Sequence, residues 1–295
     1  MKKLLSFLLL SVVMLVLAAC GSGEDTNTTA NEGQTTDNAE TTEEQTNETV
    51  TLKVGASHTP HAVILEKAKP ILAEQGIELE IEEYQDYVMP NQDLESGEIN
   101  ANYFQHIPYL EGEIAQKGYD FVNAGAIHIE PIGIYSQKYK SLDELPDGAE
   151  IIISNSVTDR GRILAMLEKE GLIKLSDDIE KTAATVDDIV ENPKNLVFKS
   201  ENESPAPEML VSLYNEGEGD AIAINSNFAI DAGINPLEES IAIEGSDSPY
   251  VNVIAVRSED KDNEAIKKLV EVLRSQEIQD FILEEWKGAV VPVSE

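Results

Sequence analysis

Five aromatic side chains fall close together between residues 84 and 109, in a chain with few aromatic residues overall. They are Tyr84, Tyr87, Tyr103, Phe104 and Tyr109. Core packing is the default role of such residues, but these five are separated by turn residues and lack regular helical or strand spacing. Aromatic residues on loops are less readily explained by core packing. The cluster therefore predicts an apolar, polarisable pocket suited to a thioether or a similar side chain.

The four histidines of the chain, His58, His61, His106 and His128, are the next candidates for chemistry. Several imidazoles with a carboxylate would suit zinc, and His58 and His61 stand three residues apart at the start of an expected helix. That spacing is weakly specific, and the chain has no histidine-rich tract that would concentrate a metal. We therefore expect no metal site, and a metal-uptake protein that uses the four histidines is kept as an alternative.

Motifs for catalysis are missing from the sequence. It has no Gly-x-Ser-x-Gly elbow, no phosphate-binding loop and no dinucleotide fingerprint, and its single cysteine lies near the N-terminus. Because the chain contains 56 Asp and Glu residues, the closeness of any two carboxylates carries no information. We expect a protein that is not an enzyme and that uses no cofactor.

The charge of the chain restricts its partners. Its 56 acidic residues outnumber the 21 Lys and Arg residues, which gives a formal net charge of −35 at pH 7. A nucleic-acid backbone requires a basic surface, so nucleic acid is excluded as a partner. We expect a small solute to be bound instead.

Apolar runs that alternate with helical patterns predict an α/β fold to position these side chains. Strands are expected at 51–56, 77–81, 99–104, 121–124, 149–154, 196–199, 221–224 and 251–256. Helices are expected at 61–75, 91–96, 108–117, 158–170, 262–274 and 276–286. Pro70 predicts a kink or a break in the first helix.

An apolar extended run, 127–135, contains Pro131 and Gly133 and suits a crossover between two lobes. We expect lobe 1 to comprise residues 51–130 plus 249–295, and lobe 2 to comprise residues 131–248. A ligand cleft is expected between the two lobes.

The N-terminal residues predict export. Two lysines precede the apolar stretch 4–19, which is shorter than the ~20 residues that a membrane-spanning helix needs. The stretch ends in small residues before Cys20, a pattern that resembles the bacterial lipobox, so residues 1–20 are expected to be a lipoprotein signal peptide. Lipidation of Cys20, for example with palmitate, would anchor the chain on the extracytoplasmic face of the cell membrane. Residues 21–50 are rich in Thr and acidic residues and predict a disordered tether.

Several segments resemble the methionine-binding lipoprotein family, in matching order along residues 51–290. They are YQDYVMPN at 84–91, INANYFQHIPYL at 99–110, NSVTDRGR at 155–162, VENPKN at 190–195, AINSN at 223–227 and SPYVN at 248–252. That family supplies the solute-binding subunit of methionine importers of the ATP-binding-cassette (ABC) class. The resemblance implies a two-lobed fold of the periplasmic-binding-protein type, whose lobes close on one amino acid.

The resemblance also implies which residues bind the solute. The methionine side chain would be surrounded by Tyr87, Phe104, His106 and Tyr109. Arg162, rather than Arg160, would bind the carboxylate, which a guanidinium can grip through two parallel hydrogen bonds. Asn225 and Asn252 would hold the amino and carboxyl groups of the ligand.

These observations predict an extracytoplasmic lipoprotein, expected to be a monomer, that captures L-methionine or a close analogue and delivers it to an ABC permease. One alternative is a binder of methionine-containing dipeptides, because the chain has ESPAPEM at 203–209 where the family commonly carries a Gln-x-Pro-Arg segment. The metal-uptake lipoprotein is a second alternative. A surface adhesin with an empty cleft is a third.

Overall fold

The computed structural model describes residues 49–245 and 247–293, which belong to one compact unit spanning residues 47–295. The expected signal peptide, the expected lipidation site Cys20 and nearly all of the expected tether lie outside the described residues. No helix in the described ranges is long and apolar enough to cross a membrane.

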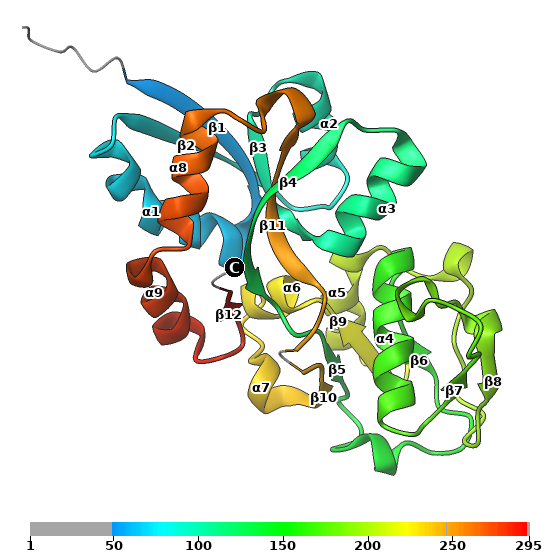
Figure 1. Ribbon diagram of the computed structural model, residues 1–295. Coiled ribbons are helices and arrows are strands. Elements are labelled where there is room, and N and C mark those ends of the chain that lie inside the picture. The colour runs from blue at the N-terminus through cyan, green and yellow to red at the C-terminus, as the bar shows by residue number, and fades with distance from the viewer. Residues whose placement is uncertain (1–48, 246, 294–295) are drawn as a thin grey trace, which may run out of the picture. The chain divides into compact units, whose positions relative to one another are not determined.

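A six-stranded mixed sheet forms the centre of the first lobe (Figure 1). Its strands lie in the order β12-β4-β11-β3-β1-β2, with β1 parallel to both β2 and β3 and the other pairs antiparallel. The strands span Val50–Ser57 (β1), Ile77–Tyr84 (β2), Ala101–His106 (β3), Phe121–Ile129 (β4), Val251–Arg257 (β11) and Val291–Pro292 (β12).

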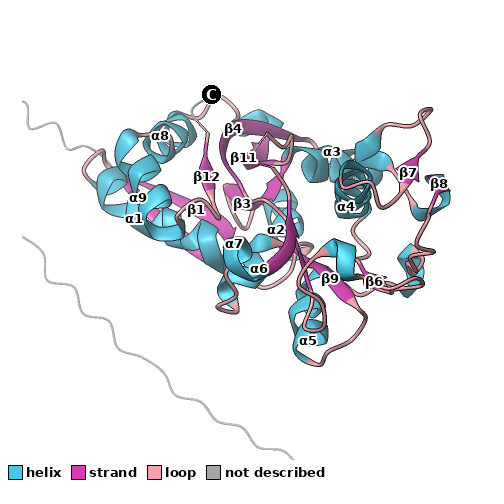
Figure 2. Cartoon of the chain, turned by 90° about the horizontal axis from the view of Figure 1, so that it is seen from below, coloured by secondary structure: helices cyan, strands magenta, loops and turns pink. Residues whose placement is uncertain are grey.

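Helices cover both faces of this sheet, as Figures 1 and 2 show. The helices of the lobe are α1 (Val63–Ala73), α2 (Met89–Ser96), α3 (Ile107–Lys117), α8 (Glu264–Leu273) and α9 (Gln276–Trp286). Strand β11 shows the alternation that this layering requires. Ile254 and Val256 pack in the core with α1, α8 and α9, whereas Val253 and Ala255 pack with residues of α2 and α3.

The second lobe is built on a smaller sheet with the strand order β10-β5-β9-β6. Its strands span Gly133–Tyr135 (β5), Ile151–Ile152 (β6), Ala221–Ile224 (β9) and Ser240–Ile243 (β10), and a separate hairpin pairs Lys174–Leu175 (β7) with Ile189–Glu191 (β8). Its helices are α4 (Val157–Lys169), α5 (Leu210–Asn215), α6 (Ser226–Asp231) and α7 (Pro236–Glu239). Short 3-10 turns lie at Leu142–Glu144, Lys181–Ala183, Val186–Asp188, Glu201–Glu203, Pro207–Met209 and, in the first lobe, Ser258–Asp260.

Two crossovers connect the sheets, one between β4 and β5 and one between β10 and β11. They run beside each other, because Glu244 N–H donates to the carbonyl oxygen of Ile132 at 3.0 Å. Helices α3 and α4 also contact each other, one from each side (Figures 1 and 2). The crossovers and these two helices place side chains from both lobes around one cavity.

The α/β class expected from the sequence is confirmed, with two local corrections. Helix α1 runs through Pro70 without the break considered there, and Glu74 N–H donates to the Pro70 carbonyl at 3.2 Å where the helix ends. The strand expected at 196–199 is wrong, because only a single bridge between Glu150 and Val197 forms there. The division into lobes at residues 130 and 249 stays a prediction.

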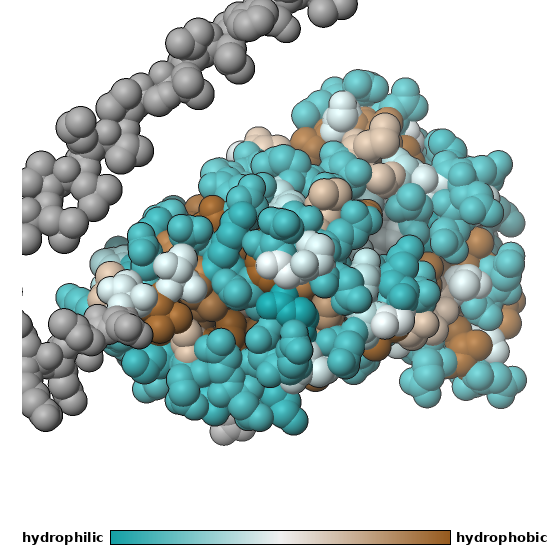
Figure 3. Space-filling view, turned by 90° about the horizontal axis from the view of Figure 1, so that it is seen from above, coloured by the Kyte–Doolittle hydropathy of each residue, from teal (hydrophilic) through white to brown (hydrophobic). Residues whose placement is uncertain are grey.

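The face drawn in Figure 3 is largely hydrophilic, with apolar residues scattered over it. This agrees with the strongly negative charge of the chain.

Candidate functional site

A cavity of about 390 Å³, partly open to solvent, lies where the two sheets meet. It is lined by Tyr87, Phe104, Gln105, His106, Tyr109, Glu130, Asp159, Arg162, Asn225, Ser226, Asn227 and Asn252. All seven residues that the sequence assigned to the ligand therefore border one space, although their roles toward a ligand stay predictions.

Aromatic rings form one wall of the cavity. The Tyr87 ring stacks on Phe228 with centroids 5.1 Å apart, and it lies 5.9 Å from Phe104 and 6.1 Å from Tyr109. Hydrogen bonds fix the two tyrosines, because Tyr87 Oη donates to Asn227 Oδ1 at 2.6 Å and Tyr109 Oη donates to the Tyr87 carbonyl at 3.0 Å. This wall offers an apolar surface with few polar atoms free to hold water.

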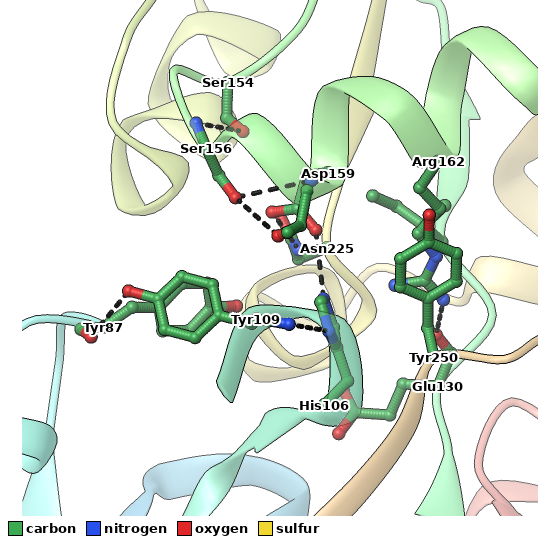
Figure 4. A network of polar contacts seen from close by, with 12 residues as sticks. Tyr87, His106, Tyr109, Glu130, Ser154, Ser156, Asp159, Arg162, Asn225 and Tyr250 are labelled. Carbon is green, nitrogen blue, oxygen red and sulfur yellow. Dashed lines mark hydrogen bonds and ion pairs between the residues drawn. The ribbon is translucent and has the colours of Figure 1, made fainter. Parts of the chain in front are cut away.

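Asp159 is the centre of the polar side of the cavity (Figure 4). It lies in the first turn of α4, where Ser156 caps the helix by accepting a hydrogen bond from Asp159 N–H at 3.4 Å. His106 Nδ1 accepts from Tyr109 N–H, so its Nε2 carries the proton that faces Asp159 Oδ1 at 3.4 Å. Asn225 Nδ2 donates to Asp159 Oδ2 at 3.1 Å.

Two buried carboxyl groups of the cavity differ in their environment. Burial alone would raise the pKa of Asp159, but His106, Arg162 and Asn225 outweigh it and hold that pKa below its ordinary range. Burial raises the pKa of Glu130, and the opposing effects of His61 and Arg162 do not cancel it. The Asp159 carboxyl group is therefore ionised at neutral pH.

Arg162 lies opposite the aromatic wall and is held from three sides (Figure 4). Its Nε donates to Glu244 Oε2 at 2.8 Å, and its Nη2 donates to the same oxygen and, at 2.6 Å, to the Glu130 carbonyl. The guanidinium carbon lies 4.6 Å from the centre of the Tyr250 ring, a cation–π contact. No acceptor in the described ranges bonds Nη1.

Arg160 serves a different purpose on the same helix. Its guanidinium donates to the Ser154 and Lys199 carbonyls and to Ser204 Oγ, all within the second lobe. It does not line the cavity. The sequence-based choice of Arg162 over Arg160 is therefore consistent with the geometry.

The four histidines fall in three separate places. His58 is exposed and pairs with Glu83 and Asp231, and His106 lines the cavity. Only His61 and His128 come together, both buried, with Glu130 between them. The four-histidine metal site considered as an alternative does not form.

Sequence reasoning missed several residues of the cavity. They include Gln105, Glu130, Asp159, Ser226 and Asn227. Four of the five lie inside the segments 99–110, 155–162 and 223–227 that carried the family resemblance. Membership of these segments is the sequence feature that could have identified the four residues. Composition could not, because Glu130 and Asp159 are two of 56 acidic residues.

Comparisons with known proteins identify the family of the chain. The family model of the NlpA lipoproteins matches residues 52–294. The methionine-binding lipoprotein of Bacillus subtilis is 47% identical over 297 residues, covering the whole of both chains. A solved putative methionine-binding lipoprotein from the same species shares 50% identity with a TM-score of 0.80, covering 83% of this chain and 98% of that one. A nutrient-binding protein from Burkholderia cenocepacia, solved bound to methionine, shares 39% identity with a TM-score of 0.77, covering 82% of this chain and 99% of its own.

Proposed function

Because the chain belongs to the NlpA lipoprotein family, we propose that its cavity binds methionine and that the protein delivers this amino acid to an ABC importer. The chain is a solute-binding protein and not an enzyme, and its solved relatives confirm the expected two-lobed fold. The observation that carries the proposal is one cavity with aromatic rings at one end and Arg162, Asp159 and two asparagines at the other (Figure 4).

The two asparagines differ in which end of the amide has a protein partner, and on that basis we assign them to opposite ends of a zwitterion. Asn225 uses its Nδ2 on Asp159, and its buried Oδ1 has no partner among the described residues. Asn252 instead uses its Oδ1, which lies 3.2 Å from His61 Nε2. We assign the free oxygen of Asn225 to the ligand ammonium group and the free Nδ2 of Asn252 to the ligand carboxylate.

The charged groups extend this assignment. Arg162 Nη1 joins Asn252 on the carboxylate, while Asp159, whose pKa is held low, joins Asn225 on the ammonium group. A dry cavity must replace the hydration of both ends of a zwitterion, and these four groups supply that replacement. The parallel two-nitrogen grip expected for Arg162 would need Glu244 to move, since Glu244 occupies the Nε–Nη2 edge.

The aromatic wall accounts for the choice of side chain. Tyr87, Phe104 and Tyr109 are proposed to enclose the thioether, and His106 borders both this wall and the polar side. Burying a methionine side chain contributes about 2–3 kcal/mol, which separates methionine from glycine or alanine but poorly from leucine. Sulfur–aromatic contacts add about 0.3–1.5 kcal/mol and favour methionine over leucine.

We propose that binding closes lobe 1, residues 51–130 plus 249–295, on lobe 2, residues 131–248. The cavity is lined from both lobes, and the crossovers that carry Glu130 and Tyr250 are the connections about which the lobes would turn. Closure is a population shift, so the ligand must bind the closed arrangement more tightly than the open one.

Calorimetric titration of the purified protein with L-methionine, D-methionine, glycylmethionine, leucine and zinc tests this function. We expect L-methionine to bind most tightly, with leucine weaker by about tenfold. Binding of glycylmethionine without binding of free methionine would favour the dipeptide alternative. Zinc binding that methionine leaves unchanged would favour metal uptake, and the absence of any binding would favour an adhesin.

We also propose that Cys20 carries a lipid that anchors the protein on the extracytoplasmic face of the membrane. Two observations support this proposal: the lipobox-like sequence before Cys20 and the match to a lipoprotein family. The matched region begins at residue 52 and does not include Cys20. In a bacterial host, the wild-type chain should incorporate labelled palmitate and fractionate with membranes, and Cys20→Ala should do neither. Labelling that persists in the variant would contradict the assignment.

A further inference from the structure

A chain of buried polar side chains lies behind the cavity wall and ends at Asn252. Tyr103 Oη contacts His128 Nδ1, and His128 Nε2 lies 2.7 Å from Glu130 Oε1. His61 Nε2 lies 3.1 Å from the same Glu130 oxygen and 3.2 Å from Asn252 Oδ1. Tyr103, His61 and His128 are at most 1% exposed and do not line the cavity, so they do not meet a ligand directly.

The direction of each hydrogen bond follows from the partners. The Tyr103 hydroxyl donates to His128 Nδ1, which leaves the proton of His128 on Nε2, where it faces Glu130. His61 Nε2 faces two oxygen atoms, so it also carries a proton. Its Nδ1 is then a bare acceptor, in agreement with its lack of any partner among the described residues. Burial lowers the pKa of His61 to about 4 and that of His128 to about 3, so both rings are neutral at pH 7.

We infer that His61 is a positioning residue that sets the polarity of Asn252 and thereby makes the cavity select a ligand with a free carboxylate. The two ends of an asparagine amide have nearly the same shape, so only hydrogen bonding decides which end faces the cavity. With His61 Nε2–H on Oδ1, the Nδ2 group must face the ligand. Glu130 and, through His128, Tyr103 keep the His61 proton on Nε2.

This inference rests on the proposed function, because it needs an amino-acid carboxylate beside Asn252. Without the His61 donor, the Asn252 amide can turn over and present its carbonyl oxygen instead. That oxygen repels a carboxylate but accepts a hydrogen bond from a carboxamide. A general loosening of the site would weaken the binding of both kinds of ligand equally. A reversed amide instead changes the ratio of the affinity for a carboxylate ligand to the affinity for a carboxamide ligand.

The experiment compares L-methionine with L-methionine amide, which replaces the carboxylate by a carboxamide, in calorimetric titrations of the wild type, His61→Leu and His61→Gln. His61→Leu should weaken L-methionine binding by about tenfold and reduce the preference for L-methionine over its amide by a similar factor. His61→Gln places an amide N–H near the former Nε2. It should restore most of the affinity for L-methionine and most of the preference for L-methionine over its amide. Circular dichroism melting establishes that each variant is folded before its titration is interpreted.

A second variant, Tyr103→Phe, keeps the inference testable if His61→Leu fails to fold. It removes only the hydroxyl that donates to His128 Nδ1. It should reduce the preference for L-methionine over its amide by a smaller factor than His61→Leu does. Equal weakening of both ligands in His61→Leu, or no effect in either variant, would overturn the inference. Zinc that stabilises the wild type but not His61→Gln would also overturn it, since both imidazoles would then be metal ligands. A wild type that binds neither ligand would refute the proposed function instead.

Discussion

Arg162→Ala is expected to bind L-methionine about a thousandfold more weakly than the wild type, because removing one partner of a buried charge pair leaves the other charge without compensation. Arg162 is 5% exposed and lines the cavity, and its Nε and Nη2 are held by Glu244 and the Glu130 carbonyl. The guanidinium is thus oriented before the ligand arrives, which lowers the cost of ordering it on binding. Titration calorimetry with L-methionine measures the loss.

Arg160→Ala is the matched control on the same helix. It removes an equally long, buried guanidinium whose hydrogen bonds all stay within the second lobe. Its melting temperature should fall, because the Ser154 and Lys199 carbonyls lose a donor, while its affinity for methionine should stay within a factor of about three. If folded Arg162→Ala kept wild-type affinity, or if both variants lost affinity equally, the assignment of Arg162 to the ligand carboxylate would be wrong.

The longer elements of the fold could be predicted from the sequence because their apolar patterns are complete. Strand β11 and helices α8 and α9 lie within two residues of their predicted bounds. Two short strands of the second lobe were missed, since β5 and β10 span only three and four residues and are defined by pairing with each other and, for β5, with β9. The 196–199 run shows the opposite failure, because Leu196 and Phe198 pack in the core of the second lobe although only Val197 forms a bridge to a strand neighbour.

The candidate site could be predicted only through residues of distinctive chemistry. Aromatic residues and Arg162 stand out in a sequence with few of either, whereas Glu130 and Asp159 are two carboxylates among 56. What distinguishes these two is burial, at 6% and 1% exposure, and burial depends on how β4 and α4 pack around the cavity. The roles of the asparagines were likewise left open, because the free end of each amide depends on partners far away in the sequence.

The segment ESPAPEM at 203–209, which raised the dipeptide alternative, does not line the inner cavity. Ala206, Pro207 and Glu208 line a neighbouring outer pocket of about 780 Å³, which is open to solvent. Tyr87 and Tyr109 line both spaces and form the partition between them. A ligand that extended past these two tyrosines into the outer pocket would therefore meet Ala206, Pro207 and Glu208.

Tyr87→Ala is expected to weaken L-methionine binding by about a hundredfold, since it removes the ring at the centre of the aromatic wall. Phe104, Tyr109 and Phe228 all pack against this ring, so its loss leaves a gap rather than a tighter wall. The gap would also join the inner cavity to the outer pocket and admit water to the thioether site. Titration at several temperatures measures the affinity and the heat capacity change of binding, which should become less negative in the variant.

Tyr87→Phe separates the ring from its hydroxyl. It keeps the stacking on Phe228 and loses only the hydrogen bond to Asn227 Oδ1, so affinity should fall by a factor of about five. Tyr87→Ala should also bring methionine and alanine closer in affinity, because the polar side of the cavity stays intact while the side-chain pocket is lost. If Tyr87→Phe weakened binding as much as Tyr87→Ala, the hydrogen bond to Asn227 would account for the lost affinity. The aromatic wall would then not be what recognises the ligand side chain.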